Sequence, residues 1–113
     1  ETERLINREA FSAMKQGAVV INIARGEIID ETALIEALDE KKLRGAVLDV
    51  YRGEFDHTPD ARLWNDNRVL ITPHISAASD INSHKGNELF LKNLNRFLGG
   101  EKLENIIDWK LGY

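Results

Sequence analysis

The stretch from residue 18 to residue 50, AVVINIARGEIIDETALIEALDEKKLRGAVLDV, decides the fold of this chain. Its first part, 18–23, is apolar and rich in β-branched side chains, which is typical of a strand buried on both faces of a parallel sheet. Residues 30–42 carry an amphipathic helix pattern that begins at the capping residue Asp30. Leu43-Arg44-Gly45 closes this helix, and a second apolar run follows at 46–50. The order strand, helix, strand at this spacing predicts a right-handed βαβ unit in an α/β fold.

Further elements are expected on both sides of this unit. A short helix, capped by Asn7 and stopped by Gly17, should precede the first strand. Residues 69–72, VLIT, read as a third strand, and the polar segment 51–67 reads as a loop with at most one turn of helix. The prediction is therefore a parallel sheet with three strands in this chain.

The C-terminal part reads as one long helix and a tail. The helix should run from 79 to 98, with Phe90, Leu94 and Phe97 as its buried stripe, and Gly99-Gly100 should end it.

Composition sets limits on the function. The 113 residues include 15 Lys+Arg and 19 Asp+Glu, a net charge of −4, with 42% hydrophobic residues, as in an ordinary globular domain. The chain has no cysteine, which excludes a disulfide framework, a thiolate zinc site and a cysteine nucleophile. No apolar run approaches the roughly 20 residues that span a bilayer, and no Lys/Arg cluster suggests nucleic acid. We expect a soluble, cytoplasmic domain that binds neither membrane nor nucleic acid.

Polar residues follow each of the three predicted strands. Arg25 follows the first, Asp49 and Glu54 the second, and His74 the third. Parallel sheets bind ligands beyond the carboxyl ends of their strands, so these side chains are expected at one edge. An arginine can bind a carboxylate in a bidentate manner, and a histidine can exchange a proton near neutral pH. Each residue alone could be an ordinary loop residue, but their placement after three strands favours a catalytic site for an anionic substrate.

Three segments carry a resemblance to a known family. MKQGAVVINIARGEIID (14–30), GAVLDVYRGEF (45–55) and LITPHISAASD (70–80) resemble the D-isomer-specific 2-hydroxyacid dehydrogenases. Members of this family use a nicotinamide cofactor to interconvert 2-oxo acids and D-2-hydroxy acids. The resemblance covers about residues 1–103, and its pattern is N-x-A-R-G, then L-D-V, then T-P-H.

The resemblance implies a role for each of these residues. Arg25 would hold the carboxylate and carbonyl of the substrate, His74 would be the acid/base, and Glu54 would be its partner. Asp49 would contact the nicotinamide carboxamide of NAD or NADP. Cofactor contacts are implied for Ile23, Ala24, Arg25, Asp49, His74 and Ser76. No metal is implied, the substrate would be a small 2-oxo acid of the glyoxylate, hydroxypyruvate or pyruvate kind, and a homo-oligomer such as a dimer is expected.

The chain also departs from the family pattern. No G-x-G-x-x-G occurs in it, so the pyrophosphate-binding turn is absent. We therefore expect the second half of a Rossmann-like doubly wound parallel sheet: residues 1–98 as the C-terminal half of a dinucleotide-binding domain, and 99–113 as a tail returning toward a substrate domain outside this chain. Two smaller departures are Phe55, where many members have proline, and Ala77, where many have glycine.

These departures leave two alternatives to a working enzyme. The chain could be a catalytically inactive remnant, or a dehydrogenase-like module of the corepressor type that binds other proteins. In residues 1–113 taken alone, the first strand would lack an upstream neighbour, leaving an apolar edge at 19–21 that favours self-association.

Overall fold

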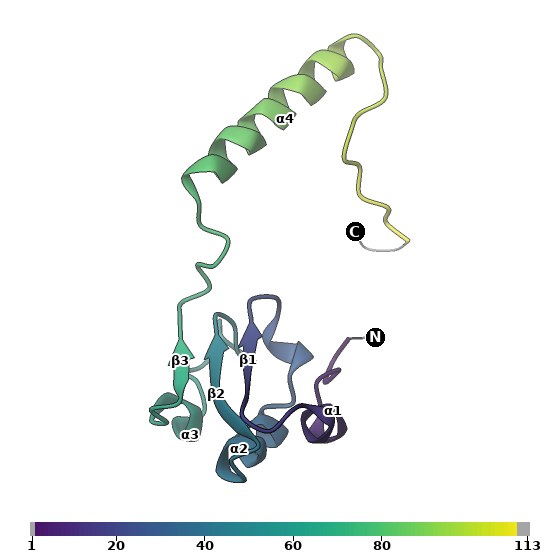
Figure 1. Ribbon diagram of the computed structural model, residues 1–113. Helices are drawn as coiled ribbons and strands as arrows, with labels where there is room; N and C mark the ends of the chain where they lie inside the picture. The colour runs from purple at the N-terminus through teal and green to yellow at the C-terminus, as the bar shows by residue number, and fades with distance from the viewer. Residues whose placement is uncertain (1, 111–113) are drawn as a thin grey trace. The chain divides into compact units, whose positions relative to one another are not determined.

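The computed structural model describes residues 2–110, which form two units that we describe separately. The first unit runs to Ser76 and the second begins at Ala77. Figure 1 shows the elements in chain order: α1 (Arg8–Ala13), β1 (Ala18–Asn22), the 3-10 helix η1 (Gly26–Ile28), α2 (Glu31–Asp39), β2 (Leu43–Leu48), α3 (Ala61–Trp64), β3 (Val69–Ile71) and α4 (Asp80–Leu98).

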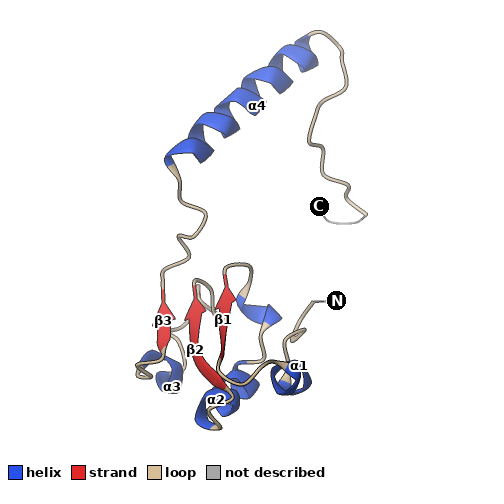
Figure 2. Ribbon diagram, in the orientation of Figure 1, coloured by secondary structure: helices blue, strands red, loops and turns tan. Residues whose placement is uncertain are grey.

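The three strands form one parallel sheet in the order β1-β2-β3. Val20 pairs with Ala46, and Ala46 pairs with Val69; the register between β1 and β2 shifts by one residue between Ala18 and Val19. The strand arrows in Figure 2 accordingly point the same way. This confirms the predicted βαβ unit and α/β fold, and it brings the carboxyl ends of all three strands to one edge of the sheet.

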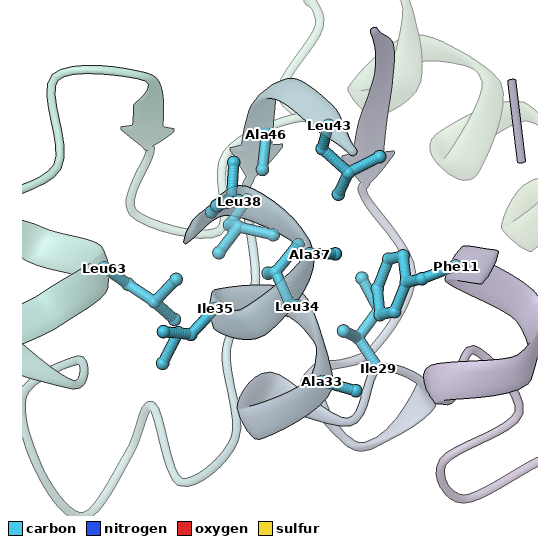
Figure 3. Packing of buried hydrophobic residues seen from close by; sticks show 11 residues of the cluster. Phe11, Ile29, Ala33, Leu34, Ile35, Ala37, Leu38, Leu43, Ala46 and Leu63 are labelled. Carbon is cyan, nitrogen blue, oxygen red and sulfur yellow. The ribbon is translucent and has the colours of Figure 1, made fainter. Parts of the chain in front are cut away.

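The core of the first unit is built around α2. Asp30 caps this helix by accepting a hydrogen bond from the Ala33 amide at 3.1 Å, as predicted. Figure 3 shows its buried side chains, including Leu34 and Leu38, lying between Phe11 of α1 on one side and Leu63 of α3 on the other. A fully buried leucine contributes about 1.5–3 kcal/mol, so this cluster is a main source of the unit's stability.

The opposite face of the sheet is open within this unit. Burial alternates along β1, and Val19 and Ile21 are 41% and 65% exposed. The prediction that this strand is buried on both faces is therefore wrong for these two residues. The physical reason is that the helices of the unit pack on one face only, against Val20 and its neighbours. The predicted apolar edge is present, because β1 is an outer strand of the sheet.

Two boundaries differ from the sequence prediction. The segment Leu43-Arg44-Gly45 belongs to β2 and does not close the helix, since Lys41 makes the turn in a left-handed conformation with φ 57°. The first helix ends at Ala13, four residues before Gly17, because Met14 is already extended. Side-chain patterns show that a helix is present, but they do not show where it ends when a lysine, and not a glycine, takes the left-handed conformation in the turn.

The second unit consists of α4 and the chain that follows it. Ser79 caps the helix, accepting from the Ile81 amide at 3.2 Å. The expected stripe of Phe90, Leu94 and Phe97 is 41–71% exposed, so the prediction that it is buried is wrong for this unit. The segment after the helix makes polar contacts with it, such as those between Asn93 and the backbone of Glu104 at 2.9 and 3.0 Å, and leaves these three side chains uncovered.

Across residues 2–110, no helix is long and apolar enough to cross a membrane. The predicted boundaries 1–98 and 99–113 stay predictions, and residues 111–113 of the expected tail lie outside the described residues.

Candidate active site

The loops after β1, β2 and β3 carry the residues singled out from the sequence. Arg25 lies three residues beyond β1, Glu54 six residues beyond β2 and His74 three residues beyond β3. All six residues implied as cofactor contacts lie in these loops or at their start. The parallel sheet thus places the whole predicted set at its carboxyl edge.

Glu54 and His74 form a direct pair. The His74 Nδ1 lies 2.8 Å from the Glu54 Oε1, which confirms the hydrogen bond expected between them. The carboxylate can only accept, so Nδ1 carries the hydrogen and Nε2 is the nitrogen that can gain or lose a proton. The Glu54 side chain is 12% exposed and that of His74 is 36% exposed. The pair therefore presents a proton-exchanging group to a ligand while its orienting carboxylate stays shielded.

Asp49 holds the loop that carries His74. This residue is 2% exposed, and its carboxylate accepts from the Thr72 hydroxyl, from the Ile75 amide at 3.0 Å and from the Ser76 amide at 2.8 Å. Its backbone carbonyl accepts from the His74 amide at 2.9 Å.

These contacts have electrostatic and conformational consequences. Hydrogen bonds from Ser76 and Thr72 hold the pKa of the Asp49 carboxyl far below its usual range, so the group is ionised. They also support the left-handed conformation of His74, whose φ is 53° and which is unfavourable for a residue with a side chain. Sequence reasoning found Asp49 but gave no role to Thr72, which it quoted only as the first residue of the T-P-H pattern.

Arg25 is exposed and available. Its Nη1 donates to the carbonyl of Ala24 at 2.6 Å. Within 2–110, no carboxylate lies within ion-pair distance of its guanidinium. Within residues 2–110, no hydrogen bond or ion pair joins Arg25 to Glu54 or His74, so the structure brings that pair together and leaves the arginine as a separate cation on the loop after β1.

The next residue, Gly26, fixes the loops against each other. A Cβ at Gly26 would lie 2.2 Å from the carbonyl carbon of Tyr51, 2.3 Å from its oxygen and 2.4 Å from the Arg52 nitrogen. Only glycine allows this approach. The loop that carries Arg25 therefore packs directly against the segment that leads to Glu54.

Two of the predicted cofactor contacts, Ile23 and Ala24, lie on an apolar stretch of surface. Ile23 is 61% exposed, and Ala24 and Ser76 are also exposed. A hollow of about 410 Å³ runs along β1 and is lined by Ile21, Ile23 and Ala24 together with Ile28. Direct contact of these residues with a cofactor stays a prediction. Among the residues that the structure describes, no group of three His, Asp or Glu side chains could hold a metal ion.

A second hollow lies beside His74. It has a volume of about 520 Å³, and its walls include Tyr51, Phe55, Trp64 and Pro73 in addition to the Glu54–His74 pair. The Phe55 ring centroid lies 6.1 Å from that of His74, with the planes tilted by 33°. The sequence marked Phe55 only as a departure from the family pattern, whereas the structure makes it a neighbour of the imidazole.

With this geometry in place, comparison with known proteins identifies the class. Residues 1–76 match the family described as "D-isomer specific 2-hydroxyacid dehydrogenase, NAD binding domain". A D-isomer-specific 2-hydroxyacid dehydrogenase from Xanthobacter autotrophicus Py2, solved in complex with NADPH and MES, superposes with a TM-score of 0.84 at 34% identity. That match covers 99% of this chain and 45% of the other.

Curated relatives agree with this assignment. A glyoxylate reductase from Pyrococcus horikoshii is 43% identical over 101 residues, covering 89% of this chain and 30% of its own length. A D-3-phosphoglycerate dehydrogenase from Methanocaldococcus jannaschii is 36% identical over 108 residues, covering 96% and 20%. This chain belongs to the D-isomer-specific 2-hydroxyacid dehydrogenase family, as the sequence resemblance indicated. It spans between a fifth and a third of the length of these two relatives.

Proposed function

We propose that this chain supplies part of the active site of an oxidoreductase that transfers a hydride between NAD(P)H and a 2-oxo acid, giving a D-2-hydroxy acid. The observation that carries the proposal is the Glu54–His74 pair, at 2.8 Å, on the carboxyl edge of a parallel sheet. A carboxylate that orients an imidazole, together with an exposed arginine on the loop after another strand of the same sheet, suits the reduction of a ketone that carries a carboxylate.

The three residues have separate roles in this proposal. Arg25 binds the substrate carboxylate, because its guanidinium is exposed and has no carboxylate partner within residues 2–110. His74 donates the proton on Nε2 to the carbonyl oxygen as negative charge develops there. Glu54 keeps Nδ1 protonated and the ring oriented. Asp49 stays ionised throughout and keeps the His74 loop in place.

The residues at the sheet edge fit a nicotinamide cofactor. Exposed Ile23 offers an apolar surface, and the neighbouring backbone at Ala24 and Ser76 is accessible. NAD(P)H, when bound, supplies the hydride. Ile23, Ala24, Arg25, His74 and Ser76 would hold its nicotinamide end. For Asp49, a direct contact is a weaker part of the proposal, since the amides of Ile75 and Ser76 and the Thr72 hydroxyl already occupy its oxygens.

Within the class of 2-oxo acids, we propose a small substrate of the glyoxylate, hydroxypyruvate or pyruvate kind. The support is the 43% identity to a protein named glyoxylate reductase. Whether NADH or NADPH is the partner depends on the adenosine half of the site, for which this chain carries no residues of the fingerprint type.

A hybrid enzyme tests the proposal. The segment of the Pyrococcus horikoshii glyoxylate reductase that aligns over 101 residues is replaced by this chain's residues. We expect the hybrid to oxidise NADH or NADPH in the presence of glyoxylate, hydroxypyruvate or pyruvate, and to form the D product from substrates that give a chiral alcohol. Replacing Arg25 with Ala should raise KM for the 2-oxo acid. A folded hybrid that turns over none of the three acids would contradict the proposal.

A second candidate is a non-catalytic interaction module. The observation in its favour is the exposed apolar face and free edge of β1, with Val19 and Ile21 exposed. Self-association through this edge would give a homo-oligomer without any chemistry. The inactive hybrid described above, together with a stable oligomer of this chain alone, would favour this candidate over the enzyme.

A further inference from the structure

The turn after β1 is organised by a buried asparagine, Asn22. Its side chain is 6% exposed and lies at the last position of the strand. The side-chain oxygen accepts from the Ala24 amide at 3.1 Å, and the side-chain nitrogen donates to the Arg25 carbonyl at 2.9 Å. The backbone from 22 to 25 thus closes around the amide group of Asn22.

The side-chain amide of Asn22 can make both hydrogen bonds of this turn in one orientation only. The backbone N–H of Ala24 can only donate and the carbonyl of Arg25, which also accepts from the Ile28 amide at 3.3 Å, can only accept, so the oxygen and nitrogen of Asn22 cannot exchange places. An aspartate would offer two acceptors and no donor. A serine is too short to reach both groups. Asparagine is therefore the side chain that this turn requires, and the burial of a polar group is explained by the two contacts it makes.

The backbone on the far side of Arg25 is fixed as well. Gly26 packs against the Tyr51–Arg52 peptide so closely that a Cβ would lie 2.2 Å from the carbonyl carbon of Tyr51. Arg25 itself is extended, with φ −146° and ψ 145°. Its Cα is consequently held from both sides, by Asn22 through residues 24 and 25 and by the packing of Gly26, while its side chain remains exposed.

From this geometry we infer that Asn22 is a positioning residue for Arg25: its side-chain amide sets the direction in which the guanidinium leaves the sheet edge. The inference rests on the proposed function, because it matters only if Arg25 binds the substrate carboxylate. It parallels the contacts of Asp49 at the end of β2, where a buried polar side chain holds the loop that carries His74. A binding group kept in place before the substrate arrives loses less freedom on binding, which lowers KM.

The test uses the hybrid enzyme and two substitutions. Asn22→Ser removes the contact with the Arg25 carbonyl, because a hydroxyl that reaches the Ala24 amide cannot reach that carbonyl as well. Asn22→Asp keeps the shape and the acceptor for Ala24, and places an acceptor against the Arg25 carbonyl. We expect both to raise KM for the 2-oxo acid about tenfold or more, with kcat/KM falling by up to about 10²-fold and KM for the cofactor changing much less. Asn67→Ser, at an exposed asparagine of the same unit, is the matched control and should leave both constants unchanged.

A double-mutant cycle separates positioning from general stability. If Asn22 acts through Arg25, then Asn22→Ser should have little effect on kcat/KM in a hybrid that already carries Arg25→Ala. If Asn22→Ser lowers kcat/KM by the same factor in the hybrid with Arg25 and in the hybrid carrying Arg25→Ala, the inference is overturned. It is also overturned if KM for the 2-oxo acid is unchanged in both Asn22 variants. If Arg25→Ala alone leaves KM for the acid unchanged, it is the proposed role of Arg25 that fails, so the two failures are distinguishable.

Discussion

Replacing Gly26 with alanine should damage both stability and catalysis, and the structure gives the size of the effect. The new Cβ would lie 2.2–2.4 Å from three backbone atoms of the Tyr51–Arg52 peptide, about 1 Å inside the ordinary contact distance of 3.4–4 Å. Those atoms are backbone and cannot rotate away. The Arg52 amide is also tied to the Glu31 carboxylate at 2.8 Å. Overpacking of this kind costs about 1–3 kcal/mol, and we expect about 3 kcal/mol because the partner cannot yield.

The same clash should also displace Glu54 of the active site. Relief of the contact requires the peptide to move by about 1 Å, and Glu54 follows only two residues later. A misplacement of about 1 Å can cost about 10²-fold in rate. We expect that loss in kcat/KM of the hybrid enzyme carrying Gly26→Ala, alongside the loss of stability in urea unfolding of the 113-residue chain.

Gly86 is the matched control for this substitution. It lies inside α4, and a Cβ there would meet nothing within 4 Å. Gly86→Ala should therefore leave kcat/KM unchanged and stabilise the helix by up to about 1 kcal/mol. The reasoning would be refuted if Gly26→Ala matched the parent in both the free energy of unfolding and kcat/KM.

Three further predictions follow from the same contacts. In the hybrid enzyme, Glu54→Ala should lower kcat for 2-oxo acid reduction by up to about 10²-fold, because the His74 ring loses the acceptor at 2.8 Å that orients it; an unchanged kcat would contradict the pairing. Hydrogen bonds from Arg68 lower the pKa of the Asp66 carboxyl, and the hydrogen bonds that Asp49 accepts lower the pKa of its own carboxyl. Each carboxylate therefore contributes its full stabilisation when the pH is above its pKa in the unfolded chain, and that contribution is lost as the pH falls toward its pKa in the folded chain. The free energy of unfolding in urea should thus fall with pH below about pH 5, and it should fall less steeply in Asp66→Asn than in the parent chain. The same pH dependence in both proteins would contradict this role of Asp66. The 113-residue chain alone should show no micromolar binding of NADH in calorimetric titration and should self-associate in light scattering, less so with Ile21→Lys at the exposed edge; tight binding by a strict monomer would contradict the account.

The sheet was predictable from the sequence because its signals are local. Apolar runs at regular spacing, with a capped amphipathic helix between the first two, predict a βαβ unit, and the observed parallel pairing of β1 with β2 agrees with it. What the sequence could not show is which surfaces other parts of a protein cover. Val19 and Phe90 look alike in a pattern of buried residues, yet both are exposed within their own units.

The candidate site was predictable as a set of residues but not as a set of contacts. Arg25, Asp49, Glu54 and His74 stand out because each follows a strand, and the pairing of Glu54 with His74 follows from that placement. The contacts that hold the loops come from residues with no chemistry of their own to mark them. For example, the sequence does not show that the Thr72 hydroxyl and the Ile75 amide donate hydrogen bonds to the buried Asp49 carboxylate in the folded chain.

The most direct test of the account is the effect of removing the imidazole of His74. We predict that His74→Gln in the hybrid enzyme lowers kcat for 2-oxo acid reduction by about 10²–10⁴-fold, the usual contribution of a general acid, with a much smaller effect on the dissociation constant of the reduced cofactor, for which His74 would be one contact among five. His84→Gln, at the exposed histidine of α4, serves as the matched control and should retain full activity. A His74→Gln hybrid that reduces the 2-oxo acid as fast as its parent would contradict the central claim that this chain provides the proton donor.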